Sequence, residues 1–298
     1  MQLSTPVAIG TSPLHISHGT PLLSLGSCFA DNIGQKLQTA GHDIVCNPFG
    51  TLYNPLSIAL ALTHALDDRE IDPSWTVECQ GLWHSWMHHS RFSHPDRDKC
   101  LQNCNEAIHL AHGQLQRRPL LLVTFGTAYV YALASGPHQG RVVANCHKVP
   151  PQQFTRSRLT VALIVDTWRP LLGRLAELGC TVIFTVSPIR HIADGLHANQ
   201  LSKSTLLLAI DTLMTDRETD CKMPVCHYFP AYEILLDQLR DYRFYARDMC
   251  HPSDLAIDIV WQHFQDTYMT PSTIQQNILN TKASLRSGHR PITNNATT

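Results

Sequence analysis

The stretch PLLSLGSCFADNIGQKL, residues 21–37, changes its pattern half-way along. Its first five residues form a short apolar run, which is typical of a buried strand. Phe29, Ile33 and Leu37 then recur at every fourth position, and this spacing predicts a helix. The change falls on Gly26-Ser27-Cys28. A glycine and two potential nucleophiles therefore stand where a strand is expected to end and a helix to begin.

The same alternation of apolar runs and helical patterns continues along the chain. Strand-like runs are HDIVCNPFG, PLLLVTFG and CTVIFTVSP, and a short strand is expected in VCHYFP. Helices are expected from Asn54 as N-cap, over 157–178, over 199–215, and from Ser253 as N-cap. Continuous apolar strands separated by helices indicate an α/β fold with a mainly parallel central sheet that is covered on both faces.

Three segments depart from this pattern. Residues 68–118 are polar and rich in His and Trp, and we expect an insertion of loops and short helices there. Residues 127–146 resemble a hairpin-like excursion. We expect a single domain over residues 1–270, followed by a C-terminal helix and polar tail over 271–298.

Composition restricts the classes of function. The chain has 298 residues, 43% of them apolar, so it can bury a substantial core, and its net charge of −1 favours neither a nucleic acid nor a membrane as partner. No apolar run approaches the roughly 18 residues of a membrane span, and the first residues lack the pattern of a signal peptide. We therefore expect the ten cysteines to be reduced thiols in a cytoplasmic protein, with Cys46 and Cys180 as inert core residues.

The position of Ser27 and Cys28 is chemically informative. Ligands of parallel α/β sheets bind at the carboxyl ends of the strands. A nucleophile at such an end stands clear of the sheet, beside free N–H groups of the next helix that lower a thiol pKa and can hold an oxyanion. Gly26 suits the turn because it lacks a Cβ atom. The alternative is a purely structural role, in which Ser27 is the N-cap of the helix and Cys28 is a buried core residue.

A nucleophile needs a base, and ARDMCHPSD provides the best candidate. Asp248 precedes His251 by three residues in an expected loop. A carboxylate at that spacing can fold back onto one imidazole nitrogen and leave the other to face the reacting atoms, as in a catalytic triad.

Several blocks of the chain, in order, resemble the GSCFA-domain family. These blocks are LSLGSCFADNIG, NPFGTLYNP, TFGTAYVY, NCHKVP, TVSPIRH and the segment from Tyr228 to Ser253. That family is grouped with the SGNH (GDSL-like) hydrolases. The resemblance implies a flavodoxin-like three-layer α/β/α sandwich, acyl or ester chemistry, and no cofactor or metal.

The resemblance also implies roles for particular residues. Keeping Gly26 in register with the Gly-Asp-Ser turn of the superfamily puts Cys28 on the nucleophilic serine, whereas a slip by one residue keeps Ser27 in that role. The Gly50 N–H is the implied oxyanion donor. The third block has Ala128 where the superfamily has asparagine. The missing amide leaves three candidates for an assisting donor: Thr127, which follows Gly126, and Asn54 or Asn145.

Further polar residues have two readings each. Arg190 and His191 follow a strand and either line the pocket or form a salt-bridged loop. Asn145, His147 and Lys148 either bind a substrate anion or form a polar turn. His84 and His88 have a zinc-compatible i, i+4 spacing, but no neighbouring acid completes the motif, so we expect no metal and instead a pocket wall that includes Trp83 and Trp86.

These expectations combine into one leading function and two alternatives. We expect an acyl-ester hydrolase with a Cys28 (or Ser27)–His251–Asp248 triad, acting on a small-molecule or carbohydrate ester. An acyltransferase to a sugar or alcohol acceptor could use the same site. A catalytically inactive binding protein is the third reading, and its best support is the missing asparagine.

Overall fold

The computed structural model describes residues 5–10, 12–215 and 225–288. Its centre is a five-stranded sheet in which every neighbouring pair is parallel, in the order β10-β9-β5-β1-β2. The strands are β1 (Leu22–Gly26), β2 (Ile44–Cys46), β5 (Leu120–Phe125), β9 (Thr181–Val186) and β10 (Cys226–Tyr228). Strand order reverses between β1 and β5, so the carboxyl ends of these two strands are where the fold leaves a crevice for a ligand.

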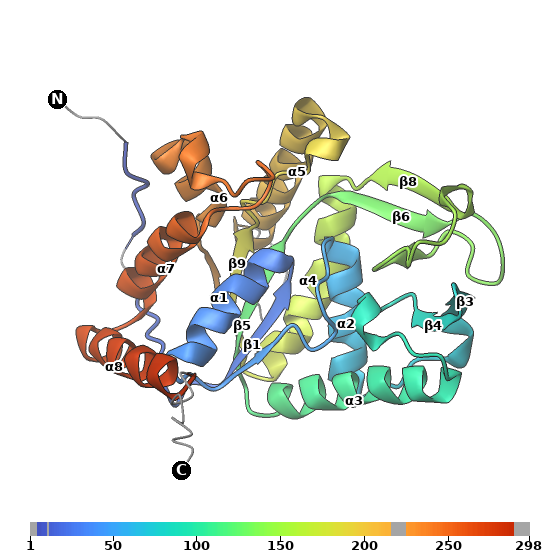
Figure 1. The fold of residues 1–298 in the computed structure, drawn as a ribbon, viewed down its shortest axis with the longest axis horizontal. Coiled ribbons are helices and arrows are strands. Elements are labelled where there is room, and N and C mark those ends of the chain that lie inside the picture. Colours follow the sequence, from blue (N-terminus) through green and yellow to red (C-terminus); the bar gives the residue numbers. More distant parts are fainter. Residues whose placement is uncertain (1–4, 11, 216–224, 289–298) are drawn as a thin grey trace, which may run out of the picture.

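Helices cover both faces of this sheet, which confirms the three-layer α/β/α architecture (Figure 1). Leu22 of β1 packs in one core cluster with residues of α1 and α7, while the adjacent Leu23 packs in another with residues of α2, α3, α4 and α5. Successive strand side chains point to opposite faces, so a continuous apolar strand supplies both cores. The helices are α1 (Cys28–Thr39), α2 (Pro55–Asp67), α3 (Arg97–Leu115), α4 (Val161–Glu177), α5 (Leu196–Thr215) and α7 (Asp254–Tyr268).

The expected N-caps Asn54 and Ser253 are observed, and Ser27 has the role that the sequence allowed as an alternative, the N-cap of α1. The side chains of Ser27, Asn54 and Ser253 each accept a hydrogen bond from a backbone N–H in the first turn of α1, α2 and α7. Shorter elements connect the layers: 3-10 helices at Pro73–Trp75, Ser90–Phe92, Pro151–Gln153, Ile192–Asp194 and Tyr242–Phe244, and the short α6 (Ala231–Glu233), which continues as a π-helix over Ile234–Leu239.

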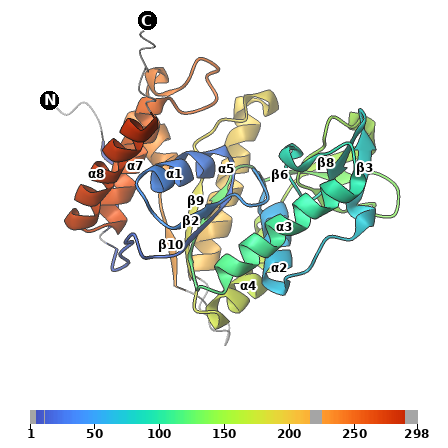
Figure 2. The same cartoon turned by 60° about the horizontal axis from the view of Figure 1, so that its bottom comes forward.

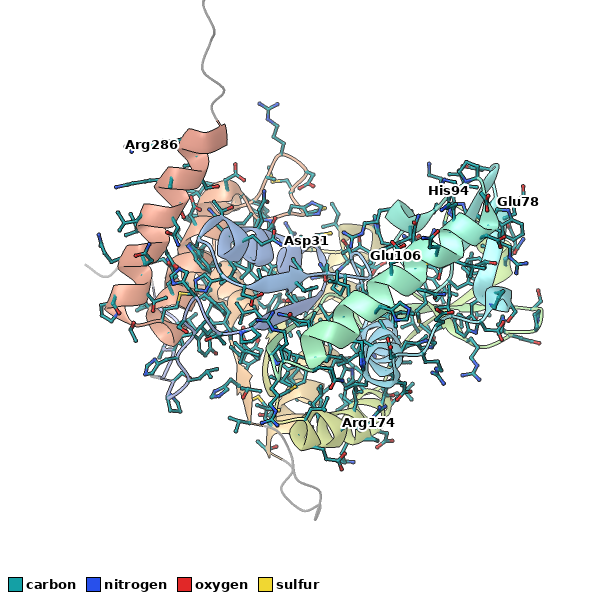
Figure 3. All side chains as sticks on the ribbon, turned by 90° about the horizontal axis from the view of Figure 1, so that it is seen from below. Asp31, Glu78, His94, Glu106, Arg174 and Arg286 are labelled. Carbon is teal, nitrogen blue, oxygen red and sulfur yellow. The ribbon has the colours of Figure 1, made fainter. Side chains whose placement is uncertain are left out.

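The expectation of loops and short helices over residues 68–118 was wrong. The segment holds a hairpin, β3 (Thr76–Cys79) with β4 (Leu82–Ser85), and then α3, a helix of 19 residues. The buried face of α3 includes Cys100, Cys104 and Gln114, which weakens its hydrophobic periodicity although the helix packs in the main core. Figures 2 and 3 show α3 running along the molecule. In Figure 3, Glu78 and His94 of the insertion lie on the opposite side of the molecule from Arg286 of α8 (Pro271–Gly288).

The excursion after β5 is larger than expected. It forms a separate three-stranded antiparallel sheet from β6 (Tyr129–Leu133), β7 (Val142–Val143) and β8 (Phe154–Arg158). We expected a helix from Ser157, but Ser157 lies in β8. The helix begins at Val161, because Thr160 accepts a hydrogen bond from the Leu163 N–H and caps it.

The C-terminal helix is α8 (Pro271–Gly288), and it is attached by polar contacts. Asn277 Oδ1 lies 2.9 Å from His42 Nε2, and Asn280 Nδ2 donates to the Ala40 carbonyl at 2.8 Å. The expected polar tail, residues 289–298, lies outside the described residues. No helix within the described ranges is long and apolar enough to cross a membrane.

Candidate active site

The turn at the end of β1 requires a glycine. Gly26 has a φ of +145°, and a Cβ atom there would lie 2.2 Å from the carbonyl oxygen of Thr124 on the neighbouring β5. Its N–H donates to Asn47 Oδ1 at 2.8 Å. The chain can therefore leave the sheet between β1 and β5 only without a side chain, and this exit sets the positions of the two residues that follow.

Ser27 and Cys28 have different surroundings. Ser27 is buried, and its Oγ accepts from the Phe29 N–H at 3.3 Å as the cap of α1. Cys28 is half-buried, and its Sγ lies 3.6 Å from the Tyr53 hydroxyl. Burial raises the pKa of Tyr53 well above its ordinary value, with a further contribution from Cys28, so the phenol stays protonated and can donate to the sulfur. The serine is thus occupied as a cap, and the thiol is accessible.

Asp248 and His251 form the hydrogen bond that their spacing predicts. Asp248 Oδ2 lies 2.6 Å from His251 Nδ1, and Oδ1 accepts from the N–H groups of His251 and Cys250 at 3.0 and 2.9 Å. These bonds, first the His251 N–H and then the Cys250 N–H, lower the pKa of Asp248 to about 2. The carboxylate is therefore charged near neutral pH, and it orients the ring so that Nε2 is the free nitrogen.

The end of β9 holds this loop in place. The Arg190 N–H donates to the Cys250 carbonyl at 3.0 Å, and Arg190 Nη1 donates to the Met249 carbonyl at 3.1 Å. The Ala246 N–H donates to the His251 carbonyl at 2.7 Å. Met249 has a φ of +57°, in the left-handed region, which lets the chain turn back within the Asp-x-x-His segment.

A cavity of about 500 Å³ lies at the carboxyl ends of β1, β5 and β9. Ser27, Cys28 and His251 all line it, so residues far apart in the sequence share one cavity. The three-stranded β6–β8 sheet forms another part of its wall. The other lining residues are Tyr53, Asn54, Thr127, Tyr129, Tyr131, Val143, Ala144, Asn145, Cys146, Arg156, Ser187, Ile189, Arg190, His191, Ile192, Ala193, Asp194 and Cys250.

Gly50, Gly126 and His147, which were expected to hold the oxyanion or the substrate, do not line this cavity. The Gly50 N–H donates to the Asn47 carbonyl at 2.8 Å, so the expectation of an oxyanion donor there was wrong. Gly126 contributes only backbone bonds, its N–H donating to the Tyr53 carbonyl. His147 is buried against His84 in the insertion, with its Nε2 2.7 Å from the Ser85 carbonyl.

The expected wall of Trp83 and Trp86 is also absent from the pocket lining. Trp86 packs with Leu133 and Val143 in a small core cluster behind the wall. In the described part of the chain, no group of three or more His, Cys, Asp or Glu side chains is arranged to hold a metal ion.

Asn54 and Thr127 remain candidates for an assisting donor. Asn54 Oδ1 accepts from the Ser57 N–H at 2.9 Å, and Nδ2 donates to Ser57 Oγ at 3.0 Å, which uses one of its two amide hydrogens. Thr127 Oγ1 accepts from the Tyr129 N–H at 3.1 Å. Asn145 Oδ1 accepts from the His147 N–H at 2.9 Å, so its amide group is also free to donate.

His191 lines the pocket as an uncharged ring. Burial, followed by the charge of Lys203, lowers the pKa of His191 to about 4. Its backbone N–H donates to Asn199 Oδ1 at 2.9 Å, which fixes the start of the loop before α5. Near neutral pH, His191 can therefore donate or accept a hydrogen bond without adding charge to the pocket.

Sequence reasoning missed two residues that support the pocket. The fully buried Lys203 of α5 donates from Nζ to the carbonyls of Gly126 and Ser187 at 2.6 and 2.7 Å, joining the ends of β5 and β9. Asp31 of α1, labelled in Figure 3, accepts from Asn47 Nδ2 at 2.6 Å and Thr51 Oγ1 at 3.1 Å. A lysine within the apolar segment LSKSTLLLAI was the one signal available for the first.

Comparison with known proteins supports the resemblance found in the sequence. The model of the GSCFA family matches residues 21–264, which span β1 to the last turns of α7. The chain belongs to the GSCFA family. Membership of the GSCFA family suggests a hydrolase-like function. Neither the curated proteins nor the solved structures contain a match to this GSCFA protein.

Proposed function

We propose that this protein is an acyl-ester hydrolase in which Cys28 is the nucleophile, His251 the general base and Asp248 the group that orients it. The observation that carries the proposal is the 2.6 Å bond between Asp248 and His251 Nδ1, on a histidine that lines the same cavity as Cys28. A nucleophile, a base and a carboxylate behind the base are the parts of a triad.

Cys28 is preferred to Ser27 for a geometric reason. Ser27 Oγ caps α1 and is buried, so attack by Ser27 would remove the cap of the helix that positions it. Cys28 is the first residue of α1, where backbone N–H groups have no acceptor within the helix. The positive end of the helix stabilises negative charge that develops on the sulfur during the reaction, and the Tyr53 hydroxyl at 3.6 Å adds a donor.

The proposed reaction has two steps. Cys28 Sγ gives its proton to His251 Nε2 and attacks the ester carbonyl; the carbon–oxygen bond to the alcohol then breaks, and the leaving oxygen takes the proton from His251. Water next gives a proton to His251 and attacks the thioester, the carbon–sulfur bond breaks, and the proton returns to the sulfur. The products are the acid and the alcohol, and no further reactant is consumed.

The oxyanion formed in each step needs donors from the pocket. The proposal assigns this role to the Cys28 N–H at the start of α1 and to Asn54 Nδ2, which keeps one amide hydrogen after its bond to Ser57. Asn54 thereby supplies the side-chain amide that is missing at Ala128. Asn54 lines the cavity of about 500 Å³, which we call the acyl pocket from here on, and it is therefore the first assisting donor to test.

The size of the acyl pocket indicates an acyl group larger than acetyl. A volume of about 500 Å³ falls within the range of ligand sites that hold a drug-sized molecule. Val143, Ala144 and Ile189 give it an apolar wall. The nine cysteines among the described residues are free thiols, which suits a reducing compartment such as the cytoplasm.

The experiment compares four variants on 4-nitrophenyl esters: Cys28→Ala, Ser27→Ala, His251→Ala and, as a matched control in the same pocket, Cys146→Ala. Cys28→Ala and His251→Ala should abolish turnover, and Cys146→Ala should retain it. Ser27→Ala should lower the free energy of unfolding, because it removes the cap of α1, and should leave kcat largely unchanged. Iodoacetamide should alkylate Cys28 before the other cysteines, and His251→Ala should slow that reaction.

Other outcomes identify the alternatives. Retained turnover in Cys28→Ala with loss in Ser27→Ala would contradict the choice of nucleophile. Product analysis with a sugar or alcohol acceptor separates transfer from hydrolysis, because both would pass through the same thioester. Uniform alkylation of all exposed thiols, together with no turnover on any ester, would favour a binding protein.

A further inference from the structure

A second cavity adjoins the acyl pocket, and Arg190 lines both. It has a volume of about 230 Å³ and lies between α5, the π-helix and the loop before α7. We call it the side pocket. Its lining includes Arg190, Arg240, Asp241, Tyr242 and Tyr245.

The side pocket has an excess of positive charge. It contains the guanidinium groups of Arg190 and Arg240, and neither forms an ion pair within the described ranges of the chain. The one acidic residue in its lining, Asp241, is paired with Arg243 at 2.7 Å. Two guanidiniums without carboxylate partners favour an anionic ligand, because their planar donors match carboxylate and phosphate oxygens.

The side pocket is also aromatic. The Arg190 guanidinium lies 5.1 Å from the centre of the Tyr245 ring and 5.7 Å from that of Tyr242. Tyr242 is 65% exposed, so its ring is accessible to a ligand in the side pocket. The two tyrosine rings lie 6.2 Å apart and are tilted by 46°. Aromatic rings beside a cation give a flat ligand a surface to pack on while its charged group binds the guanidiniums.

The proposed chemistry gives this cavity a role. His251 protonates the leaving oxygen, so the alcohol part of the ester must lie beside His251 when the bond breaks. The backbone immediately before that residue is held by Arg190, through the carbonyls of Met249 and Cys250. The alcohol therefore leaves toward Arg190, and the side pocket is the adjoining space.

We propose that the side pocket binds the leaving group of the ester, and that this group carries an anion, either phosphate or carboxylate, on a ring-containing alcohol. This assignment rests on the proposed function, because that function sets the orientation of the ester, with its acyl part at Cys28. The binding of an anion to the side pocket, however, needs no catalysis and can be measured separately.

The test measures binding of phenyl phosphate, benzoate and benzyl alcohol to the full chain by calorimetry or ligand-observed NMR. Phenyl phosphate or benzoate should bind, benzyl alcohol should bind at least tenfold more weakly, and the stronger anion identifies the class. Arg240→Gln should weaken anion binding about fivefold or more, and Arg240→Lys should restore part of it. Tyr242→Ala should weaken phenyl phosphate binding but not that of inorganic phosphate.

The controls separate charge from site and binding from catalysis. Arg286→Gln makes the same change of net charge on α8, at a residue that lines none of these cavities, and it should leave anion binding unchanged. Cys28→Ala should bind phenyl phosphate like the parent protein. Equal affinity in Arg240→Gln and Arg286→Gln, or binding of benzyl alcohol as strong as that of phenyl phosphate, would overturn the inference. If the parent protein hydrolyses no ester but binds anions in a way that depends on Arg240, the side pocket remains an anion site. That result would contradict only the proposed triad.

Discussion

Lys203→Met is the substitution whose effect follows most directly from the structure. Lys203 is fully buried, and its ammonium group donates to two carbonyls that belong to the ends of β5 and β9. Methionine has nearly the same length and fills the same space without a charge or a donor. The change therefore tests what the ammonium group contributes, with little change in packing.

Two effects of this substitution oppose each other near neutral pH. Losing two hydrogen bonds from a charged donor costs about 1.5–3 kcal/mol each. Burial lowers the pKa of Lys203 from 10.5 to about 7, which corresponds to a cost of about 5 kcal/mol for holding the charge inside the protein. Because the two amounts are similar, stability at a single pH near 7 decides little.

The pH dependence is decisive. Between pH 7 and 10.5, the lysine is protonated in the unfolded chain and largely neutral in the folded one, so the unfolded state binds more protons. The stabilisation is fully present above the unfolded pKa and is lost as the pH falls toward the folded pKa. The free energy of unfolding of the parent, minus that of Lys203→Met, should therefore rise by up to about 1.4 kcal/mol per pH unit in this window.

Urea unfolding of both proteins at pH 7, 8 and 9 measures this difference, and the comparison cancels the titration of the groups that do not interact with Lys203. A difference that stays flat over these pH values would refute the reasoning. It would mean that the carbonyls of Gly126 and Ser187 hold the ammonium charged at its ordinary pKa.

Three further predictions concern the Asp248–His251 pair, the loop that contains Gly50, and the acyl pocket. Asp248→Asn should lower kcat roughly 10²- to 10⁴-fold without unfolding the protein, because an amide stabilises the tautomer of His251 that cannot accept a proton; near-normal kcat would contradict the triad. Gly50→Ala should lower the free energy of unfolding by about 2 kcal/mol or more, because its Cβ would lie 2.2 Å from the Cβ of His89. The control Gly136→Ala, at a φ of +86° with open space around the new Cβ, should lower it by only about 1 kcal/mol. Equal losses of stability in the two variants would contradict the steric argument. Octanoyl esters should exceed acetyl esters about tenfold in kcat/KM, and Ala144→Phe should reverse this preference in the same esterase assay.

Much of the fold was predictable because local and global signals agreed. The apolar runs predicted β1, β5 and β9. The four-residue spacing of Phe29, Ile33 and Leu37 predicted α1, and the capping residue Asn54 predicted the start of α2. The helix α3 was missed because cysteines and a glutamine occupy much of its buried face, and these residues carry a weak hydrophobic signal. Strand β8 was missed because four of its five residues are exposed and polar, without a buried face to set a period.

The candidate site was predictable where it depends on neighbours in sequence. Asp248 and His251 are three residues apart, so their bond could be inferred from spacing. Gly50 could not be judged in this way, because the acceptor of its N–H depends on the φ of +41° that Asn47 adopts in the same loop. Lys203 was equally out of reach, since its two acceptors come from strand ends that only the assembled sheet brings together.

The small β6–β8 sheet has a consequence for how this protein can be altered. All three of its strands lie in the connection between β5 and α4, and it supplies Tyr129, Tyr131 and Arg156 to the acyl pocket. The thiol and the imidazole come from other segments, at the two ends of the matched region. Exchanging the β6–β8 sheet for one of different length or shape would change which ester the proposed hydrolase accepts, while the reacting groups stay in place. This sheet is therefore the natural target for changing substrate selectivity.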